Sequence, residues 1–307
     1  MKVGCTLPQS GSVASPENLI RVATRAEELG YDSVWVFERL LCPTNPRDPY
    51  PPSPDGSWPT NFQNVFDPIE TLTFVAAHTN KLRLGTSVIV LPYHQPIHLA
   101  RRLATLDVLS GGRVEICGGV GWSHDEFEAS GVPFAGRGQR TDEILEAMIA
   151  IWTHDQVRFD GALYKIPESK IGPKPVQKPH PPIHLAGFGQ YAFDRAAKYG
   201  NGWNPVGPMD FDSFDASVKQ LQATAHQAGR NDLEVVLLSY PVITDASPGG
   251  TRPPMVGTLS ELRGDVQRLR EIGVTHLIFA PQEMGYSPTS RIEPALTRIE
   301  QLIELTR

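Results

Sequence analysis

The stretch from Leu82 to Trp122 constrains the fold more than any other part of the chain. It reads LRLGTSVIVLPYHQPIHLARRLATLDVLSGGRVEICGGVGW, in which two apolar runs flank a helical pattern. Ala100, Leu103, Ala104 and Val108 share one face of that predicted helix. Each apolar run ends in a polar, glycine-containing turn. The pattern predicts a β–α–β unit, in which a helix connects two parallel strands.

The alternation of strand and helix continues along the rest of the chain. Further strands are predicted at Lys2–Leu7, Ser33–Phe37, Pro182–Ala186, Gly202–Asn204, Leu233–Val242 and Thr275–Ala280. With the two strands of the first unit, they give eight strand–helix pairs in order. This order predicts an α/β fold of the (β/α)8 TIM-barrel type. The alternative, a doubly wound open sheet, would need a GxGxxG turn after the first strand, where the chain has LPQSGSVAS.

The whole chain, 1–307, is predicted to form a single barrel domain with two insertions. One follows strand 2, at about 39–66, and the other lies between strands 4 and 5, at about 153–181. The first is rich in proline and is either a plain surface insertion or a lid over the barrel mouth. Tyr50, Trp58 and Phe62 favour the lid. In the second, VRFDGALYKI predicts a hairpin.

Composition argues against several classes of function. A net charge of −6 gives no electrostatic case for nucleic acid or an anionic membrane as partner. No apolar run approaches the ~20 residues of a membrane helix, and the N-terminus lacks a secretory apolar region. Three cysteines without a CxxC pair predict reduced thiols and a cytoplasmic location. The scattered histidines form no HxH or HExxH pattern, so no metal site is expected.

Several predicted strand ends carry side chains suited to proton transfer. The active site of a TIM barrel lies at the carboxyl ends of its strands. Glu38 and Arg39 follow the second strand, His94 follows the third and Glu283 follows the last. His94 is either a donor to substrate or cofactor or a solvent-exposed loop residue. Glu38 and His94 are the predicted catalytic candidates.

Two glycine-rich turns are candidates for ligand contact. Ala186–Gln190 (AGFGQ) joins a strand to a helix, where backbone N–H groups and the helix N-terminus can hold a phosphate. The alternative there is a tight turn that needs positive φ. Gly118–Trp122 is glycine-dense at a strand end, which suggests the close approach of a ligand ring. Trp122 would form an aromatic pocket wall or cap the core.

Together, these segments resemble the bacterial luciferase-like monooxygenase superfamily, and within it the branch of predicted F420-dependent oxidoreductases. The similar segments are DSVWVFER, the run from LGTSVIVLPYHQP to SGVPFAGRG, RTDEILEAMIAIW, KPVQKPHPPIHLAGFGQYAFDRAAKYGNGWNP and GTLSELRGDVQRLREIGVTHLIF. They cover nearly the whole chain in order. The resemblance implies a TIM barrel that binds a flavin or a 5-deazaflavin at the strand carboxyl ends.

The resemblance also implies roles for individual residues. It implies a non-prolyl cis peptide at Ser87-Val88, behind the central ring of the cofactor, with Gly121 and Trp122 on the substrate side. The other implied cofactor contacts are Glu126 near the ribityl chain, the phosphate turn of Gly187, Phe188, Gly189 and Gln190, and the pocket residue Trp203. The anionic tail of the cofactor is expected near Arg137 and Arg140.

Two departures distinguish this chain from other branches of the superfamily. The sugar-phosphate dehydrogenases carry a catalytic histidine after the second strand and an acid after the fourth, where this chain has Arg39 and Trp122. The luciferase-type catalytic histidine near the second strand is also absent, since Glu38 and Arg39 follow Phe37. The mechanisms of those branches are therefore not transferred.

Three functional hypotheses follow from the resemblance. The first is hydride transfer between coenzyme F420 and a small organic substrate held under the Leu40–Phe66 loop. The second is a two-component FMN-dependent monooxygenase, which would need reduced flavin, O2 and a separate cofactor reductase. The third, of another class, is a non-catalytic flavin-binding protein. A homodimer is expected from the family alone.

Overall fold

The centre of the molecule is a closed ring of parallel strands. The computed structural model describes residues 1–53, 55–282 and 291–307. Eight strands form the ring in the order β3-β2-β1-β13-β10-β9-β8-β5, and β3 pairs with β5 to close it. They are β1 (Lys2–Thr6), β2 (Ser33–Val36), β3 (Arg83–Thr86), β5 (Val114–Gly119), β8 (Ile183–Ala186), β9 (Gly202–Asn204), β10 (Glu234–Ser239) and β13 (His276–Phe279). The predicted (β/α)8 barrel is confirmed, and the closed ring contradicts the open sheet.

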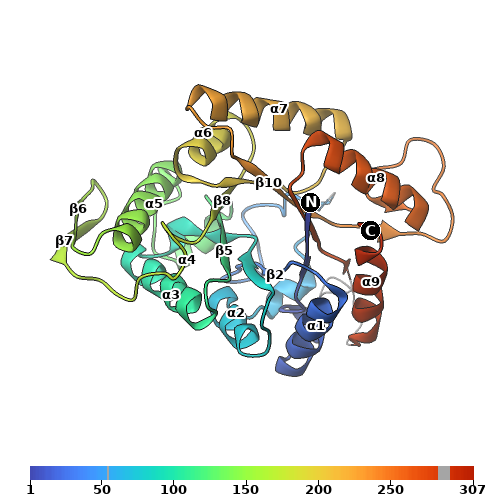
Figure 1. Ribbon diagram of the computed structural model, residues 1–307, viewed down its shortest axis with the longest axis horizontal. Coiled ribbons are helices and arrows are strands. Elements are labelled where there is room, and N and C mark those ends of the chain that lie inside the picture. Colours follow the sequence, from blue (N-terminus) through green and yellow to red (C-terminus); the bar gives the residue numbers. More distant parts are fainter. Residues whose placement is uncertain (54, 283–290) are drawn as a thin grey trace.

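Helices surround the ring and connect successive strands (Figure 1). They are α1 (Pro16–Leu29), α2 (Pro68–Ala76), α3 (Pro96–Leu109), α5 (Arg137–Thr153), α6 (Gln190–Tyr199), α7 (Phe211–Gln227), α8 (Leu259–Ile272) and α9 (Glu293–Ile303). Local signals fix their ends: the side chain of Ser15 accepts a hydrogen bond from the backbone N–H of Asn18, and α1 stops at Gly30. The apolar periodicity predicts α5 over Thr141–Trp152, so its start is predicted four residues too late, because the first turn, RGQR, is polar.

Short elements account for the insertions. β6 (Val157–Asp160) and β7 (Lys165–Ser169) form the predicted hairpin, which projects from the barrel (Figure 1). The predicted strand Leu233–Val242 is divided, because Pro241 has no N–H for a ladder, and β11 (Val242–Ile243) pairs with β12 (Val256–Gly257). The remaining short elements are η1 (Gly11–Val13), η2 (Thr60–Gln63), β4 (Ile89–Val90), η3 (Leu91–Tyr93) and α4 (His124–Ala129).

The interior of the barrel is apolar in its middle. Trp35, Cys117, Val236 and Ile278 fill it and are fully buried. Burying an aromatic or aliphatic side chain of this size contributes about 1.5–3 kcal/mol, so this layer holds the ring of strands together. A second, larger apolar core lies between the strands and the helices.

The amino-terminal end of the barrel holds a buried polar network. Arg83 forms an ion pair with Glu115, and His184 Nε2 lies 3.0 Å from a carboxylate oxygen of Glu234. Nδ1 of His276 lies 3.7 Å from Glu115. Burial lowers the pKa of His276 to about 4, so its imidazole is neutral near pH 7. This network lies at the end of the barrel opposite the strand carboxyl ends, so we assign it to the fold.

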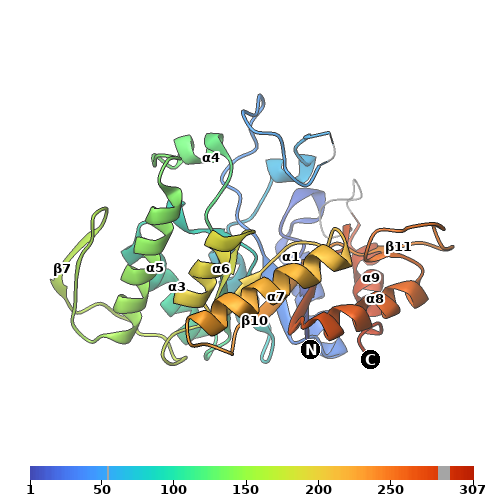
Figure 2. The same cartoon turned by 90° about the horizontal axis from the view of Figure 1, so that it is seen from above.

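One face of the barrel is covered by a loop. In Figure 2, α4 and the Leu40–Phe66 loop lie on one side of the molecule, and the two termini lie on the other. All ring strands run parallel to β1, which begins at the N-terminal side. The covered face is therefore the carboxyl-terminal face, where a barrel active site is expected.

Candidate active site

A carboxylate–imidazole pair lies at the mouth of the barrel. Glu38, directly after β2, is buried, and its Oε1 lies 2.8 Å from Nε2 of His94, which follows η3. The backbone N–H of Val90 donates to the other oxygen of Glu38 at 2.6 Å. A carboxylate offers only acceptors. We therefore assign Nε2 of His94, which faces Oε1, as the protonated ring nitrogen. The structure brings together the two predicted catalytic candidates, although they are separated by 56 positions.

A second carboxylate, Glu126, lies nearby and is fully buried. Nη1 of Arg39 donates to its Oε2 at 2.8 Å, and the backbone N–H of Leu40 donates to its Oε1 at 2.9 Å. The hydroxyl of Tyr93 is 3.3 Å from Oε2, and burial together with Glu126 raises the pKa of that hydroxyl. Protein donors contact both oxygens of this carboxylate, so Glu126 holds the loop entrance, and its cofactor contact stays a prediction.

The Leu40–Phe66 loop carries aromatic rings to the mouth. Trp58 lies 5.1 Å from Trp122 and Tyr50 lies 5.9 Å from it, measured between ring centroids. Phe62 packs edge-on against Tyr50 at 5.3 Å. Burial and the neighbouring Tyr240 raise the pKa of Tyr50, so its hydroxyl stays neutral. These contacts place Trp122 in an aromatic wall, and they favour the predicted lid over a plain surface insertion.

Polar contacts fasten the outer part of this loop to α4. The carboxylate of Asp48 accepts from the backbone N–H of His124 at 2.6 Å and lies 3.0 Å from its Nδ1. The backbone N–H of Arg47 donates to Asp125 at 2.9 Å. Both contacts join the loop after β2 to the segment after β5, so the two walls of the mouth are connected.

The Ser87-Val88 peptide bond is cis, as the resemblance implied. Oγ of Ser87 donates to the side-chain oxygen of Asn204 at 2.9 Å, and the amide of Asn204 donates to the carbonyl of Val236 at 2.6 Å. Val88 packs on the interior layer of the barrel. Ser87 and Val88 therefore lie at the centre of the mouth, where the predicted ring contact would be.

Gly121 allows the chain to turn close to the mouth. Its φ is +76°, and a Cβ atom there would lie 2.8 Å from both Phe127 and Val90. Any side chain at this position would therefore be strained and would clash. In the structure it is the side chains of Phe127 and Val90 that approach Gly121 closely. Contact between Gly121 and a ligand stays a prediction.

The Ala186–Gln190 turn opens α6. Gly187 and Gly189 have φ of +122° and +77°, as the alternative of a tight turn expected, and Gly189 is the N-cap of α6. Phe188 is 69% exposed. The side-chain amide of Gln190 donates to Asp194 at 2.6 Å, next to the first turn of the helix. The turn thus has the glycines, exposure and helix N-terminus that a phosphate site needs, although phosphate binding itself stays a prediction.

Trp203 differs from expectation. Its side chain is fully buried, and its ring packs against Phe193 of α6 and Phe214 of α7. Its indole N–H donates to the carbonyl of Gly187 at 2.7 Å. Trp203 therefore faces the helices and supports the Ala186–Gln190 turn from behind. The sequence located the residue at a strand end but gave no sign of the face on which it lies.

The two arginines expected near an anionic tail lie on the first turn of α5. Nε of Arg137 donates to the carbonyl of Gly121 at 3.2 Å, which places this side chain at the mouth. Arg140 lies further away and contacts the hydroxyl of Tyr164 at 3.4 Å. Arg137 is therefore the better placed of the two for the predicted role.

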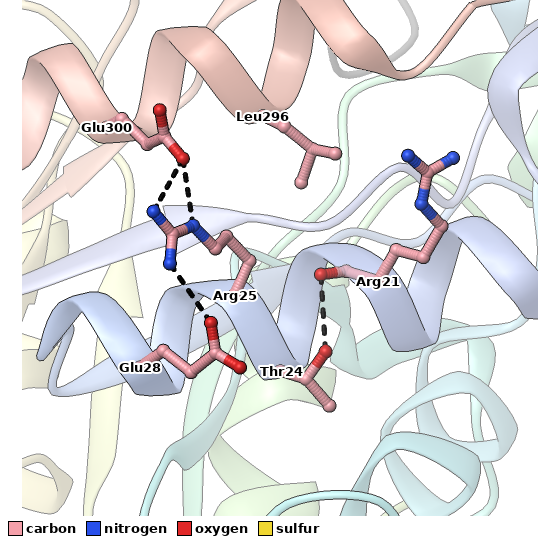
Figure 3. Close-up of a pocket in the computed structure, with 6 residues that line it drawn as sticks. All are labelled: Arg21, Thr24, Arg25, Glu28, Leu296 and Glu300. Carbon is pink, nitrogen blue, oxygen red and sulfur yellow. Dashed lines mark hydrogen bonds and ion pairs between the residues drawn. The ribbon is translucent and has the colours of Figure 1, made fainter.

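A separate surface cavity of about 250 Å³ lies between α1 and α9 (Figure 3). Arg25 lies in it, and Glu28 and Glu300 pair with its guanidinium. This cavity is lined by paired charges on outer helices, so we do not assign it to the active site.

Among the described residues no cluster of His, Cys, Asp or Glu side chains is arranged to hold a metal ion. The strand-end candidate Glu283 lies outside the described residues. Within the same ranges no helix is long and apolar enough to cross a membrane.

Fold and site define an α/β barrel with a hydrogen-bonded carboxylate–imidazole pair and an aromatic loop at the carboxyl ends of its strands. The chain belongs to the luciferase-like monooxygenase family, whose model matches residues 1–249. The family includes both F420-dependent and FMN-dependent oxidoreductases, as the following relatives show.

Three relatives match between half and more than four fifths of this chain. An uncharacterised protein of Mycobacterium tuberculosis (strain H37Rv) is 34% identical over 260 residues, 84% of each chain. An F420-dependent glucose-6-phosphate dehydrogenase of Amycolatopsis mediterranei is 30% identical over 207 residues, 66% of this chain and 56% of the relative. An FMNH(2)-dependent dimethylsulfone monooxygenase of Pseudomonas putida is 32% identical over 156 residues, 50% of this chain and 42% of the relative.

Solved structures share the fold. The monooxygenase RslO1 of Streptomyces bottropensis has a TM-score of 0.79 at 22% identity and covers 99% of this chain and 98% of its own. An F420-dependent secondary alcohol dehydrogenase has a TM-score of 0.78 at 19% identity and covers 100% of this chain and 99% of its own. At these identities the comparison supports the barrel and says nothing further of the chemistry.

Proposed function

We propose that this chain is an oxidoreductase that transfers a hydride between coenzyme F420 and a small organic substrate at the mouth of the barrel. The Glu38–His94 pair is the observation that carries the proposal. Reduction of a carbonyl by hydride needs a proton as well, and a histidine oriented by a carboxylate is suited to supply it. The match to the F420-dependent relative also extends over more of this chain than the match to the FMNH(2)-dependent one, 207 residues against 156.

The mouth has the features that a ring with a phosphate-bearing chain needs. The exposed turn at Gly187–Gly189 would hold the phosphate through backbone N–H groups, with Trp203 fixing the turn. The ring would lie against Ser87 and Val88, on the side facing Trp122. When bound, F420 supplies hydride exchange at carbon C5 of its ring.

The side chains of this chain would then orient the substrate, exclude water and move one proton. Glu38 fixes the His94 ring through Nε2, which leaves Nδ1 to take a proton from a substrate hydroxyl or, when both ring nitrogens are protonated, to give one to a substrate oxygen. His94 is only 16% exposed at its side chain, and the aromatic rings of the Leu40–Phe66 loop shield the mouth from water. A dry site strengthens the hydrogen bonds that orient the substrate.

Replacement of His94 by Gln tests the proposed proton donor. We expect kcat to fall by about 10²-fold or more, with an unchanged Kd for F420, because loss of general acid catalysis costs about 10²–10⁴-fold in rate. His98→Gln, an exposed histidine on α3, is the matched control and should leave both quantities unchanged. F420-dependent turnover that persists in His94→Gln at the wild-type rate would remove His94 from the mechanism.

Titration of the purified protein with F420 and with FMN separates the alternatives. FMN binding at micromolar Kd without F420 binding favours the FMN-dependent monooxygenase, which would work with a separate reductase. Cofactor binding without turnover of any carbonyl, enone or imine favours a non-catalytic flavin-binding protein. Light scattering with mass determination tests the expected homodimer.

A further inference from the structure

Arg39 has one polar group that the fold does not satisfy. Its side chain is 11% exposed, and its Nη1 donates to Glu126 at 2.8 Å. The other oxygen of Glu126 accepts from the backbone N–H of Leu40, so the carboxylate takes only one edge of the guanidinium. Nε of Arg39 is buried and has no hydrogen-bond partner among the described residues. A buried N–H of this kind calls for an explanation.

Three aromatic rings surround the same guanidinium. Its Cζ lies 4.9 Å from the ring centroid of Trp122, 5.0 Å from that of Phe62 and 5.5 Å from that of Trp58. Ring faces stabilise a cation through its flat surface. They offer no acceptor in the plane of the guanidinium, which is where the Nε–H bond points. The rings therefore make the environment apolar and leave the need for an oxygen acceptor unmet.

The charges around Arg39 favour a neutral acceptor. Glu126 compensates the positive charge of the guanidinium directly. Glu38, which precedes Arg39 in the chain, adds a second carboxylate, and this one pairs with His94. Arg39, Glu126 and Glu38 together carry one net negative charge. An additional anion would therefore meet repulsion in a site of low dielectric, whereas a carbonyl oxygen would not.

We propose that Nε of Arg39 donates a hydrogen bond to the oxygen of a neutral carbonyl substrate and thereby selects this substrate class. The apolar part of the substrate would pack against Trp122 and Trp58. The indole N–H of Trp58 donates to the carbonyl of Asp48 at 2.9 Å, so this ring would move together with the loop to admit the substrate. The inference rests on the proposed function, which puts the substrate at this mouth.

A binding experiment tests the inference without turnover. The holoprotein is titrated with cyclohexanone, with methylenecyclohexane, which has the same shape without the oxygen, and with cyclohexanecarboxylate, an anion. Isothermal titration calorimetry reports binding. We expect wild-type protein to bind the ketone at least tenfold more tightly than either analogue.

Two variants separate recognition from structure. Arg39→Met removes the donor at similar length, and Arg39→Lys keeps a charged partner for Glu126 but lacks the planar Nε–H. Both should weaken ketone binding about tenfold and leave the Kd for methylenecyclohexane unchanged. Arg158→Met, an exposed arginine of the β6–β7 hairpin, is the matched control.

Three results would overturn the inference: no ketone preference in wild-type protein, tighter binding of the carboxylate, or equal loss of ketone and methylenecyclohexane in both variants. The last would assign Arg39 to the aromatic wall alone. Wild-type protein that selects the ketone but shows no F420-dependent turnover would contradict the proposed function only. Wild-type protein that shows F420-dependent turnover but does not select the ketone would contradict this inference only.

Discussion

Replacement of Glu38 by Gln tests the carboxylate–imidazole pair. Glu38 accepts from the backbone N–H of Val90 at 2.6 Å and from Nε2 of His94 at 2.8 Å. Glutamine has a single side-chain oxygen, so its NH2 group would face one of these two donors. An unsatisfied buried donor costs about 1–3 kcal/mol. We therefore expect Glu38→Gln to lower the free energy of unfolding by about 1–3 kcal/mol.

Urea unfolding at constant m-value measures this change, and a double-mutant cycle assigns it to the pair. In a His94→Ala background only Val90 needs an acceptor, which the glutamine oxygen supplies, so the same substitution should cost much less. The coupling free energy should be about 1–3 kcal/mol. The exposed pair of Asp160 and Lys165 is the control, with an expected coupling of about 0.2–1 kcal/mol. Effects of Glu38 and His94 that add within about 0.5 kcal/mol would refute the pairing.

Two further predictions concern stability. The folded-state pKa of His276, about 4, lies below its ordinary 6.5, so the unfolded chain binds the proton more readily. The contribution of His276 to the free energy of unfolding is therefore fully present above pH 6.5. It is lost, by about 3 kcal/mol, as the pH falls from 6.5 through 4. Urea titrations should show a weaker pH dependence of stability in His276→Gln than in wild-type protein or in the control His226→Gln, a substitution of an exposed histidine. Gly121→Ala should destabilise by about 1–3 kcal/mol more than Gly30→Ala, because both have positive φ but only Gly121 would clash, with Phe127 among others; equal urea midpoints would contradict this.

The fold could be predicted from the sequence because its signals are local. The strand at Ser33–Phe37 is a continuous apolar run, and the helix after it is marked by its own periodicity and caps. Repetition of such pairs leaves few ways to bury every strand on both faces. Errors occurred where local signals are weak. The six-residue helix α4 was not predicted, and the start of α5 was predicted too late because its first turn is polar.

The strand ends could also be predicted, and with them the neighbourhood of Glu38, His94 and Trp122. Their partners could not. Arg39 and Glu126 are 87 positions apart, and no periodicity relates them. Only the closed ring, in which β2 pairs with β3 and β3 with β5, brings these segments together. The sequence therefore identifies side chains that reach the mouth, while the order of strands decides which of them meet.

Burial then separates two carboxylates that look alike in the sequence. The Glu126 side chain is 1% exposed, and its contacts hold together the starts of two loops, so its removal would disturb the fold before any chemistry. Glu38 is also buried, but it contacts His94, whose side chain is 16% exposed and whose Nδ1 we propose to face the substrate. The same reasoning applies to the cations: Nη1 of Arg39 serves the fold, whereas its Nε has no partner in the described chain. The groups that we propose to act on a substrate are therefore single atoms of His94 and Arg39, on side chains whose remaining contacts keep them in place.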